Sequence, residues 1–141
     1  MAVTHPSHSC ATITIGDLKI KAFSTLAGIS TNTDGVSGMP VMGQNLTTFE
    51  FSLDISDKTI PFDTIKRLFH LCWLPTREDI KEIRIVFHRD ENDDDAILTL
   101  SFNGWVSSWT VSSGTGSNTV LAITLQPALN KQHYMDMQIG N

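Results

Sequence analysis

The sequence predicts a mainly β fold: a small two-sheet β-barrel or sandwich with one short α-helix. Several segments alternate apolar and polar residues with the period of a half-buried strand, and turn residues separate these segments. A single segment carries a helical period. Short strands in quick succession are typical of sandwiches and barrels. With 141 residues, the chain is long enough for one domain with its own core.

The first elements surround a Gly16-Asp17 turn signal. Residues 1–10 show no alternation, which predicts a flexible N-terminal arm. From Ala11 to Ala22 apolar residues alternate on both sides of Gly16-Asp17, so this stretch is either a strand pair or one bent strand.

Residues 26–46 follow neither period and hold four of the nine glycines and no Lys or Arg. This composition predicts a long structureless loop, which is unusual inside a compact domain and often functional. One interpretation is a solvated surface loop. The other is a segment covered by a neighbouring subunit, because its apolar residues would prefer to be covered. These residues are Leu26, Ile29, Val36, Met39, Val41 and Met42.

The next two elements are a strand and the helix. Residues 48–56 alternate, with Phe49, Phe51, Leu53 and Ile55 on one face and Thr48, Glu50, Ser52 and Asp54 on the other. The helix begins near Pro61 and ends before Pro75. Its expected core stripe consists of Ile65, Leu68, Phe69, Cys72 and Trp73.

Further strands are predicted over 83–88, 98–102, 105–111 and 120–125. Asn103-Gly104 predicts a turn or a bulge. After it, one strand face is expected to carry Trp105, Ser107, Trp109 and Val111. The tail 132–138 is either a terminal strand or a contact arm. The predicted organisation is an arm over 1–10, a β domain over 11–129 and a C-terminal extension over 130–141.

Charge and hydropathy exclude several classes of partner. The net charge is -5, and the run 90–95 holds five of the fifteen acids, so the rest of the chain is neutral without a basic stripe. Nucleic acid is therefore not an expected partner. No apolar stretch reaches the length of a membrane span, and the N-terminus lacks the pattern of a signal peptide. Cys10 and Cys72 are expected to be free thiols of a cytosolic chain, and a bridge between them is the alternative.

Candidate metal sites are incomplete. Asp90, Asn92 and Asp94 have the spacing that begins a calcium loop, but the glycine and the final glutamate of that loop are missing, which favours a solvated hairpin turn. The zinc candidates are His5, His8, Cys10, His70 and Cys72. Their spacing matches no complete zinc ligand set. The sequence therefore predicts neither a metal site nor a cofactor.

Catalytic signals are equally sparse. Glu50 and Asp54 share a strand face and could pair as acid and base, but solvated carboxylates are the commoner case. Trp105 and Trp109 could bind a sugar, although such residues more often fill a core or an interface. No nucleophile or phosphate-binding motif is present. The chain is not expected to be an enzyme.

Three stretches together resemble the Hcp (haemolysin-coregulated protein) family of type VI secretion tubes and the related tail tube proteins of contractile phages. They are the loop 19–44 with the strand 48–55, the helix 62–73 with residues 80–90, and the segment 98–109 with the strand 120–125. The resemblance covers residues 11–129. It implies two packed β sheets that form a small barrel, and subunits that associate into hexameric rings.

The resemblance also implies a machine. Rings stack into a hollow inner tube, a sheath propels it, and the lumen carries effectors. The implied partners are further copies of the chain, sheath, spike or baseplate proteins and effector cargo, and export from the bacterial cytoplasm proceeds through the machine without a signal peptide. We expect Leu26–Gln44 to carry ring contacts. The lumen is expected to be lined either by Thr48, Glu50, Ser52 and Asp54 or by 107–112.

Other functions stay open at this point. Within the same class, the chain could be a phage tail tube protein or a ring protein near the baseplate or spike. In a different class, it could be a calcium- or sugar-binding β-sandwich module. A hydrolase without a recognisable motif is the third alternative.

Overall fold

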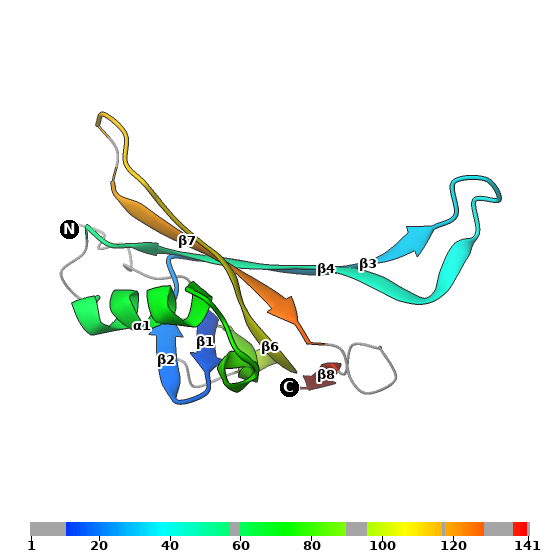
Figure 1. Ribbon diagram of the computed structural model, residues 1–141, viewed down its shortest axis with the longest axis horizontal. Coiled ribbons are helices and arrows are strands. Elements are labelled where there is room, and N and C mark those ends of the chain that lie inside the picture. The colour runs from blue at the N-terminus through cyan, green and yellow to red at the C-terminus, as the bar shows by residue number, and fades with distance from the viewer. Residues whose placement is uncertain (1–10, 57–59, 90–95, 117, 129–136, 141) are drawn as a thin grey trace.

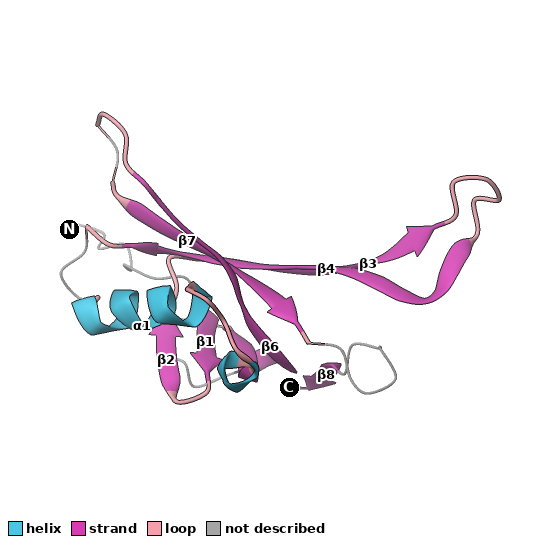
Figure 2. Cartoon of the chain, in the orientation of Figure 1, coloured by secondary structure: helices cyan, strands magenta, loops and turns pink. Residues whose placement is uncertain are grey.

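The computed structural model describes residues 11–56, 60–89, 96–116, 118–128 and 137–140. Strands account for most of this part of the chain, with one α-helix and one short 3-10 helix (Figure 2). The mainly β class with one short helix is therefore confirmed. The elements are β1 (Ala11–Ile15), β2 (Leu18–Lys21), β3 (Ser24–Thr33), β4 (Pro40–Asp54), α1 (Phe62–Cys72), η1 (Arg77–Asp79), β5 (Lys81–His88), β6 (Ala96–Ser112), β7 (Val120–Pro127) and β8 (Met137–Gly140).

The strands form one antiparallel sheet in the order β2-β1-β5-β6-β7-β4-β3, and β8 pairs with β6. The two expected sheets are thus parts of a continuous sheet that curls on itself. Phe49 of β4 stacks on Phe102 of β6 with ring centroids 4.7 Å apart, although β7 lies between these strands in the sheet. In a flat sheet, strands two places apart are separated by about 10 Å. The curl therefore brings the strands together around one core.

The core lies between the curled parts of the sheet and α1. The strand-pair interpretation of residues 11–22 is confirmed: β1 and β2 pair around Gly16, whose φ of 60° favours glycine. Of the residues predicted on one face of 48–56, Phe49, Phe51 and Leu53 are buried and Ile55 is half-buried. The buried apolar residues include Ile13, Ile15, Leu18, Ile20, Phe49, Phe51, Leu53, Ile83, Ile85, Leu121, Ile123 and Leu125.

Helix α1 follows Pro61, as predicted, and Trp73 forms its C-cap. Leu68 is fully buried, and Ile65 and Cys72 are half-buried. Phe69 and Trp73, which were expected to face the core, are 37% and 61% exposed. This part of the predicted stripe is wrong, because these two residues lie at the outer edge of the helix, where Phe69 meets the half-buried Trp109 edge-on at 5.3 Å.

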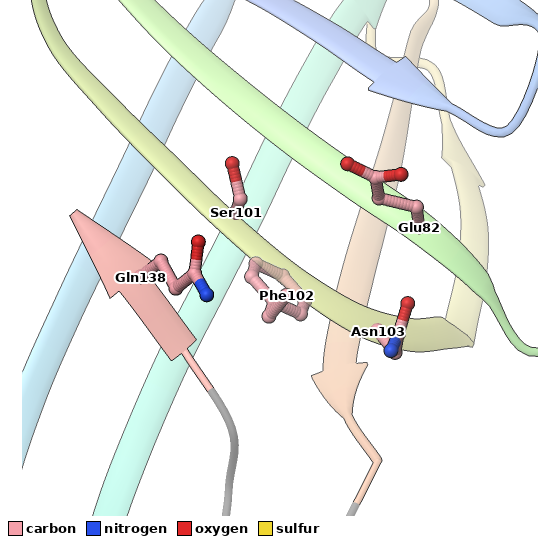
Figure 3. A pocket seen from close by; sticks show the side chains of 5 residues that line it. All are labelled: Glu82, Ser101, Phe102, Asn103 and Gln138. Carbon is pink, nitrogen blue, oxygen red and sulfur yellow. The ribbon is translucent and has the colours of Figure 1, made fainter. Parts of the chain in front are cut away.

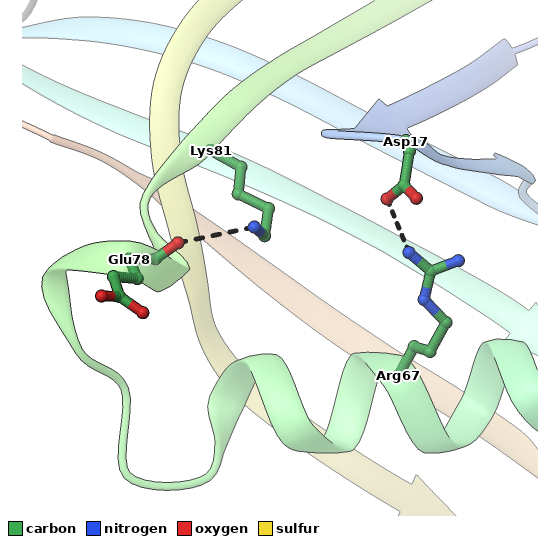
Figure 4. Close-up of polar contacts among 4 residues, drawn as sticks. All are labelled: Asp17, Arg67, Glu78 and Lys81. Carbon is green, nitrogen blue, oxygen red and sulfur yellow. Dashed lines mark hydrogen bonds and ion pairs between the residues drawn. The ribbon is translucent and has the colours of Figure 1, made fainter.

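Polar contacts connect α1 and its following turn to the sheet (Figure 4). The guanidinium of Arg67 donates to Oδ1 of Asp17 in the β1–β2 turn at 2.6 Å. The ammonium of Lys81 donates to the carbonyl of Glu78 at 3.4 Å. The Arg67 guanidinium, through its hydrogen bond, holds the pKa of Asp17 below its ordinary value. The first contact joins α1 to the β1–β2 turn, and the second joins η1 to the start of β5.

Residues 26–46 form a long β-hairpin, so the prediction of a structureless loop is wrong. Strands β3 and β4 pair from Ser24 opposite Ser52 to Thr33 opposite Pro40. Residues 34–39 make the turn, in which the amide of Asp34 donates to the carbonyl of Met39 at 2.8 Å. The hairpin extends far beyond the rest of the molecule (Figure 1). Backbone pairing builds these strands without burying a face, and therefore no alternation of apolar and polar residues marks them.

Strand β6 is 17 residues long and contains Asn103-Gly104, so this pair is not a turn. A Cβ at Gly104 would overlap the carbonyl oxygen of Gln126, and glycine is therefore required by the close approach of β7. The irregularity lies instead between Val106 and Ser108, where the register with β7 shifts. Such a bulge reverses the faces of the residues that follow it.

The bulge separates the two tryptophans of β6. Trp109 lies opposite the buried Ile123, whereas Trp105 lies opposite the exposed Gln126. Directly opposite residues in an antiparallel pair share a face. The predicted common face for Trp105, Ser107, Trp109 and Val111 is therefore wrong, because Trp109 points to the core side and Trp105 to the outside.

Residues Met137–Gly140 form a strand that pairs with β6. Of the tail predicted over 132–138 as a strand or a contact arm, Met137 and Gln138 belong to this strand, and 132–136 lie outside the described residues. Within the described residues, no helix is both long and apolar enough to cross a bilayer.

Candidate functional site

Strands β4, β7 and β6 carry a polar surface on the side away from the core, which we call the hydroxyl face. Three rows of paired residues cross β4, β7 and β6 on this side. Opposite residues share a face, so the rows form one surface. The rows are Glu50, Thr124 and Ser108, then Ser52, Ala122 and Thr110, then Asp54, Val120 and Ser112.

The sequence left two segments open as the lining of a lumen, and the hydroxyl face contains residues of both. Glu50, Ser52 and Asp54 belong to the first alternative, and Ser108, Thr110 and Ser112 to the second. Thr48, two residues before Glu50 on β4, continues the same side. That the two segments share one face could not be predicted from the sequence, because the position of β7 between β4 and β6 was unknown.

Some polar groups of the hydroxyl face make hydrogen bonds within the chain. The hydroxyls of Ser24 and Ser52 lie 2.6 Å apart. Asp54 accepts from the side-chain amide of Asn118 at 2.7 Å and from the amide of Ser56 at 3.0 Å, which ties the end of β4 to the β6–β7 loop. Glu50 is four residues from Asp54 on a strand, a distance of about 13 Å. The two carboxylates therefore do not form an acid–base pair.

The β3–β4 hairpin is the second candidate surface. Its predicted contact residues Leu26, Ile29 and Met39 are all more than half exposed, and Val36 is 99% exposed. Leu46, which the sequence did not single out, is also exposed. The backbone of Val41 and Met42 belongs to β4, and their side chains lie outside the described part of the molecule. Coverage of these apolar residues by a neighbouring subunit stays a prediction.

These apolar residues lie on different sides of the hairpin. Ile29 lies opposite Thr47, on the side that carries the buried Phe49 closer to the core. Leu26 lies opposite Glu50 and therefore on the hydroxyl face. Val36 and Met39 belong to the turn. Apolar surface is thus present on both sides of the hairpin and at its tip.

The tip has a defined conformation and a fixed charge. Oδ1 of Asp34 accepts from the amide of Val36 at 2.9 Å, and the amide of Gly38 donates to the Asp34 carbonyl at 2.8 Å. The hydrogen bond from the Val36 amide holds the pKa of Asp34 below its ordinary value. The tip therefore presents Val36 and Met39 beside an ionised carboxylate at neutral pH.

A third surface, on α1, was missed by the sequence prediction. We call it the helix stripe, and it consists of Phe62, Lys66, Phe69 and Trp73. These positions follow the spacing i, i+4, i+7 and i+11, which places them on one side of a helix. All four side chains are exposed, and Phe69 and Trp73 stack with ring centroids 5.7 Å apart. The same spacing in the sequence could have found the stripe, but Phe69 and Trp73 were assigned to the core face of the helix.

A small polar pocket of 200 Å³ opens between β5, β6 and β8 (Figure 3). Its lining is one carboxylate, one hydroxyl, two amides and one aromatic ring, from Glu82, Ser101, Asn103, Gln138 and Phe102. This set can hydrogen-bond a small polar molecule, but it contains neither a pair of acids nor a nucleophile beside a base. The pocket therefore offers no recognisable catalytic chemistry.

The metal candidates receive little support from the geometry. His5, His8, Cys10 and the acidic run 90–95 lie outside the described residues. In the described part, no group of three or more His, Cys, Asp and Glu side chains could hold a metal ion. Cys72 is a half-buried free cysteine on α1. Trp105 and Trp109 point to opposite faces and do not form a shared stacking platform.

Comparison with known proteins gives a consistent fold. No protein-family model matches the sequence, and no curated protein matches it. Hcp1 from Flavobacterium johnsoniae superposes with a TM-score of 0.61 at 11% identity, covering 93% of this chain and 94% of that one. Hcp1 from E. coli EAEC 042 gives 0.60 at 10% identity over 92% and 97% of the two chains. A type VI secretion system effector from Yersinia pestis gives 0.58 at 10% identity over 93% and 98%.

The likeness to these structures extends over nearly the whole length of both chains in each pair. At this level of identity it defines the fold and not the residues of a site. The fold that the sequence resemblance implied is confirmed, and the chain has the fold of the Hcp proteins of type VI secretion systems.

Proposed function

We propose that this chain is a structural subunit that forms hexameric rings, which stack into the inner tube of a type VI secretion-like contractile injection machine. The observation that carries the proposal is the β3–β4 hairpin. It projects from the body and exposes apolar side chains along its length. Such a surface is stable in water when another molecule covers it.

The hydroxyl face supports the same proposal. A channel that passes cargo must be wetted and must not bind the cargo tightly. Hydroxyl groups dominate the three rows of this face, and its charged members are Glu50 and Asp54. We assign this face to the lumen, with the hairpin providing contacts between subunits or between rings.

The remaining parts of the proposal follow from the assembly. The partners are further copies of the chain, the sheath, the spike or baseplate and effector cargo. The chain is made in the bacterial cytoplasm and leaves through the machine itself. Its role in this proposal is structural and not enzymatic.

Electron microscopy of the purified chain tests this proposal. Negative-stain images over a range of concentrations should contain six-membered rings with a central hole, and stacked rings at the highest concentrations. A glycan array and a calcium titration serve as the contrasting tests, because a binding module would give signals there. Single particles of one chain at every concentration would contradict the proposal.

A further inference from the structure

The helix stripe is an exposed surface of aromatic residues around one lysine. Phe62, Lys66, Phe69 and Trp73 span about 16 Å along α1 at a rise of 1.5 Å per residue. Phe62 and Trp73 are 74% and 61% exposed. A patch of this kind on a helix marks an interaction site more often than an inert surface.

The residue that follows the helix cap adds exposed apolar surface beside the stripe. Leu74 is 77% exposed and has a φ of 49°, in the left-handed region. A left-handed residue directly after the C-cap is a common way for a helix to end. Leu74 thus extends the helix stripe beyond the end of α1.

The charges around the helix stripe indicate what it binds. Helix α1 contains Lys66 and Arg67 against one acid, Asp63, and the segment after it contains Arg77, Glu78 and Asp79. Residues 22–56, which include the whole hairpin, contain Asp34, Glu50 and Asp54 and neither Lys nor Arg. The hairpin is therefore acidic, whereas the helix stripe carries the ammonium of Lys66 among its aromatic rings, and opposite charges favour contact between two surfaces.

The two surfaces cannot meet within one copy. The tip of the hairpin and α1 lie toward opposite ends of the molecule (Figure 1). Each copy therefore has one of each surface free for other copies. A contact between two different surfaces of identical subunits is head-to-tail, and it closes into a ring or continues as a filament.

We propose that the hairpin tip of one copy binds the helix stripe of the next copy. Val36 and Met39 pack on the rings of Phe69 and Trp73, a contact that the methionine thioether favours. The carboxylate of Asp34 faces the ammonium of Lys66. The proposal rests on the assembly proposed above and names the two surfaces that form its contact.

A charge-reversal cycle tests the contact. Lys66→Glu places a carboxylate opposite Asp34 and should raise the concentration for half-assembly about tenfold or more, because like charges repel across an interface. Gly35→Lys places a lysine opposite Lys66 and should have a similar effect. A Cβ at Gly35 meets no atom within 4 Å, so the new side chain fits. The double variant K66E/G35K should recover most of the lost assembly.

Lys19→Glu is the matched control. Lys19 is exposed on β2, and the substitution reverses its charge as Lys66→Glu does for Lys66. Lys19 lies outside both surfaces, so the variant should assemble like the wild type. Circular dichroism on each variant checks that the domain is folded. Assembly that is unaffected by K66E, or single variants that do not compensate each other, would overturn the contact while the ring proposal stands.

A cross-link gives an independent readout that does not depend on charge. A photoreactive benzoyl-phenylalanine in place of Trp73 should cross-link, in the assembled protein, to a peptide from residues 26–46 of another copy. Cross-links to other peptides, or none in intact assemblies, would overturn the contact. A wild-type chain that never assembles would overturn both this contact and the proposed function.

Discussion

Strand β4 runs through two regions that differ in how much apolar surface they bury. Its C-terminal part places Phe49, Phe51 and Leu53 in the core with at most 2% exposure. In its N-terminal part, paired with β3 in the hairpin, Leu46 is 56% exposed. The backbone hydrogen bonds of a β-ladder continue through both regions. The comparison shows that the C-terminal part of β4 buries its apolar side chains within one chain, whereas the hairpin leaves apolar side chains exposed. We propose that another copy covers them.

Removing the hairpin should have the largest effect and should separate the two regions. Deletion of residues 29–42 joins Gly28 to Gly43 and leaves 43–47 as a hairpin loop of ordinary length before Thr48, the partner of Gly28. We expect assembly to be abolished while the body stays folded. Electron microscopy and thermal unfolding measure the two properties. Rings formed by the deletion variant would show that the hairpin is not the contact.

Two alanine substitutions, one in the core and one in the hairpin, test whether the two regions differ in their contribution to stability. Phe49→Ala removes a fully buried ring that stacks on Phe102 and should lower the free energy of unfolding by about 3–5 kcal/mol. Ile29→Ala lies on the same side of β3–β4 but is 55% exposed, so the change should stay within about 0.5 kcal/mol. Chemical denaturation of the unassembled protein measures both. Equal losses would mean that the hairpin contributes to the core of its own chain.

Gly104→Ala tests the close approach of β6 and β7. The added methyl group would overlap the backbone of Gln126 in β7, and relief of this overlap should cost about 1–3 kcal/mol. Gly28→Ala is the control in the hairpin, since a Cβ there meets no atom within 4 Å. Denaturation curves of both variants decide the result. A tolerated alanine at position 104 would contradict the close approach of β6 and β7.

The smallest expected effect concerns the exposed ion pair between Asp17 and Arg67. The pKa of Asp17 is held below its ordinary value of 3.8 by Arg67, so the stabilisation is present above that pH and is lost as the pH falls through the lower, folded pKa. Arg67→Ala should therefore reduce the loss of stability on acidification below about pH 4. Thermal unfolding at several pH values measures this. An unchanged pH profile would mean that the pair adds nothing in solution.

The sequence was informative where a face is buried. The alternation in β4, β5 and β7 and the helical period around Leu68 follow from one side packing on the core. The hairpin was predicted as a loop because neither of its faces is buried within one chain, so no period marks it. Asp34-Gly35 was the available turn signal at its tip.

The candidate surfaces were predictable only in part. The exposed apolar residues of the hairpin were visible in composition, but the shared hydroxyl face required the strand order β6-β7-β4. The bulge at Ser107 has no residue signature, and it reversed the faces assigned to Trp105 and Trp109. The helix stripe was missed because the helical period assigned Phe69 and Trp73 to the core face, although they are 37% and 61% exposed.

Light scattering of the purified chain across concentrations tests assembly most directly. The account predicts a species of about six times the 15.6 kDa mass of one chain, with multiples of that mass as rings stack. A mass of one chain at every concentration would contradict it.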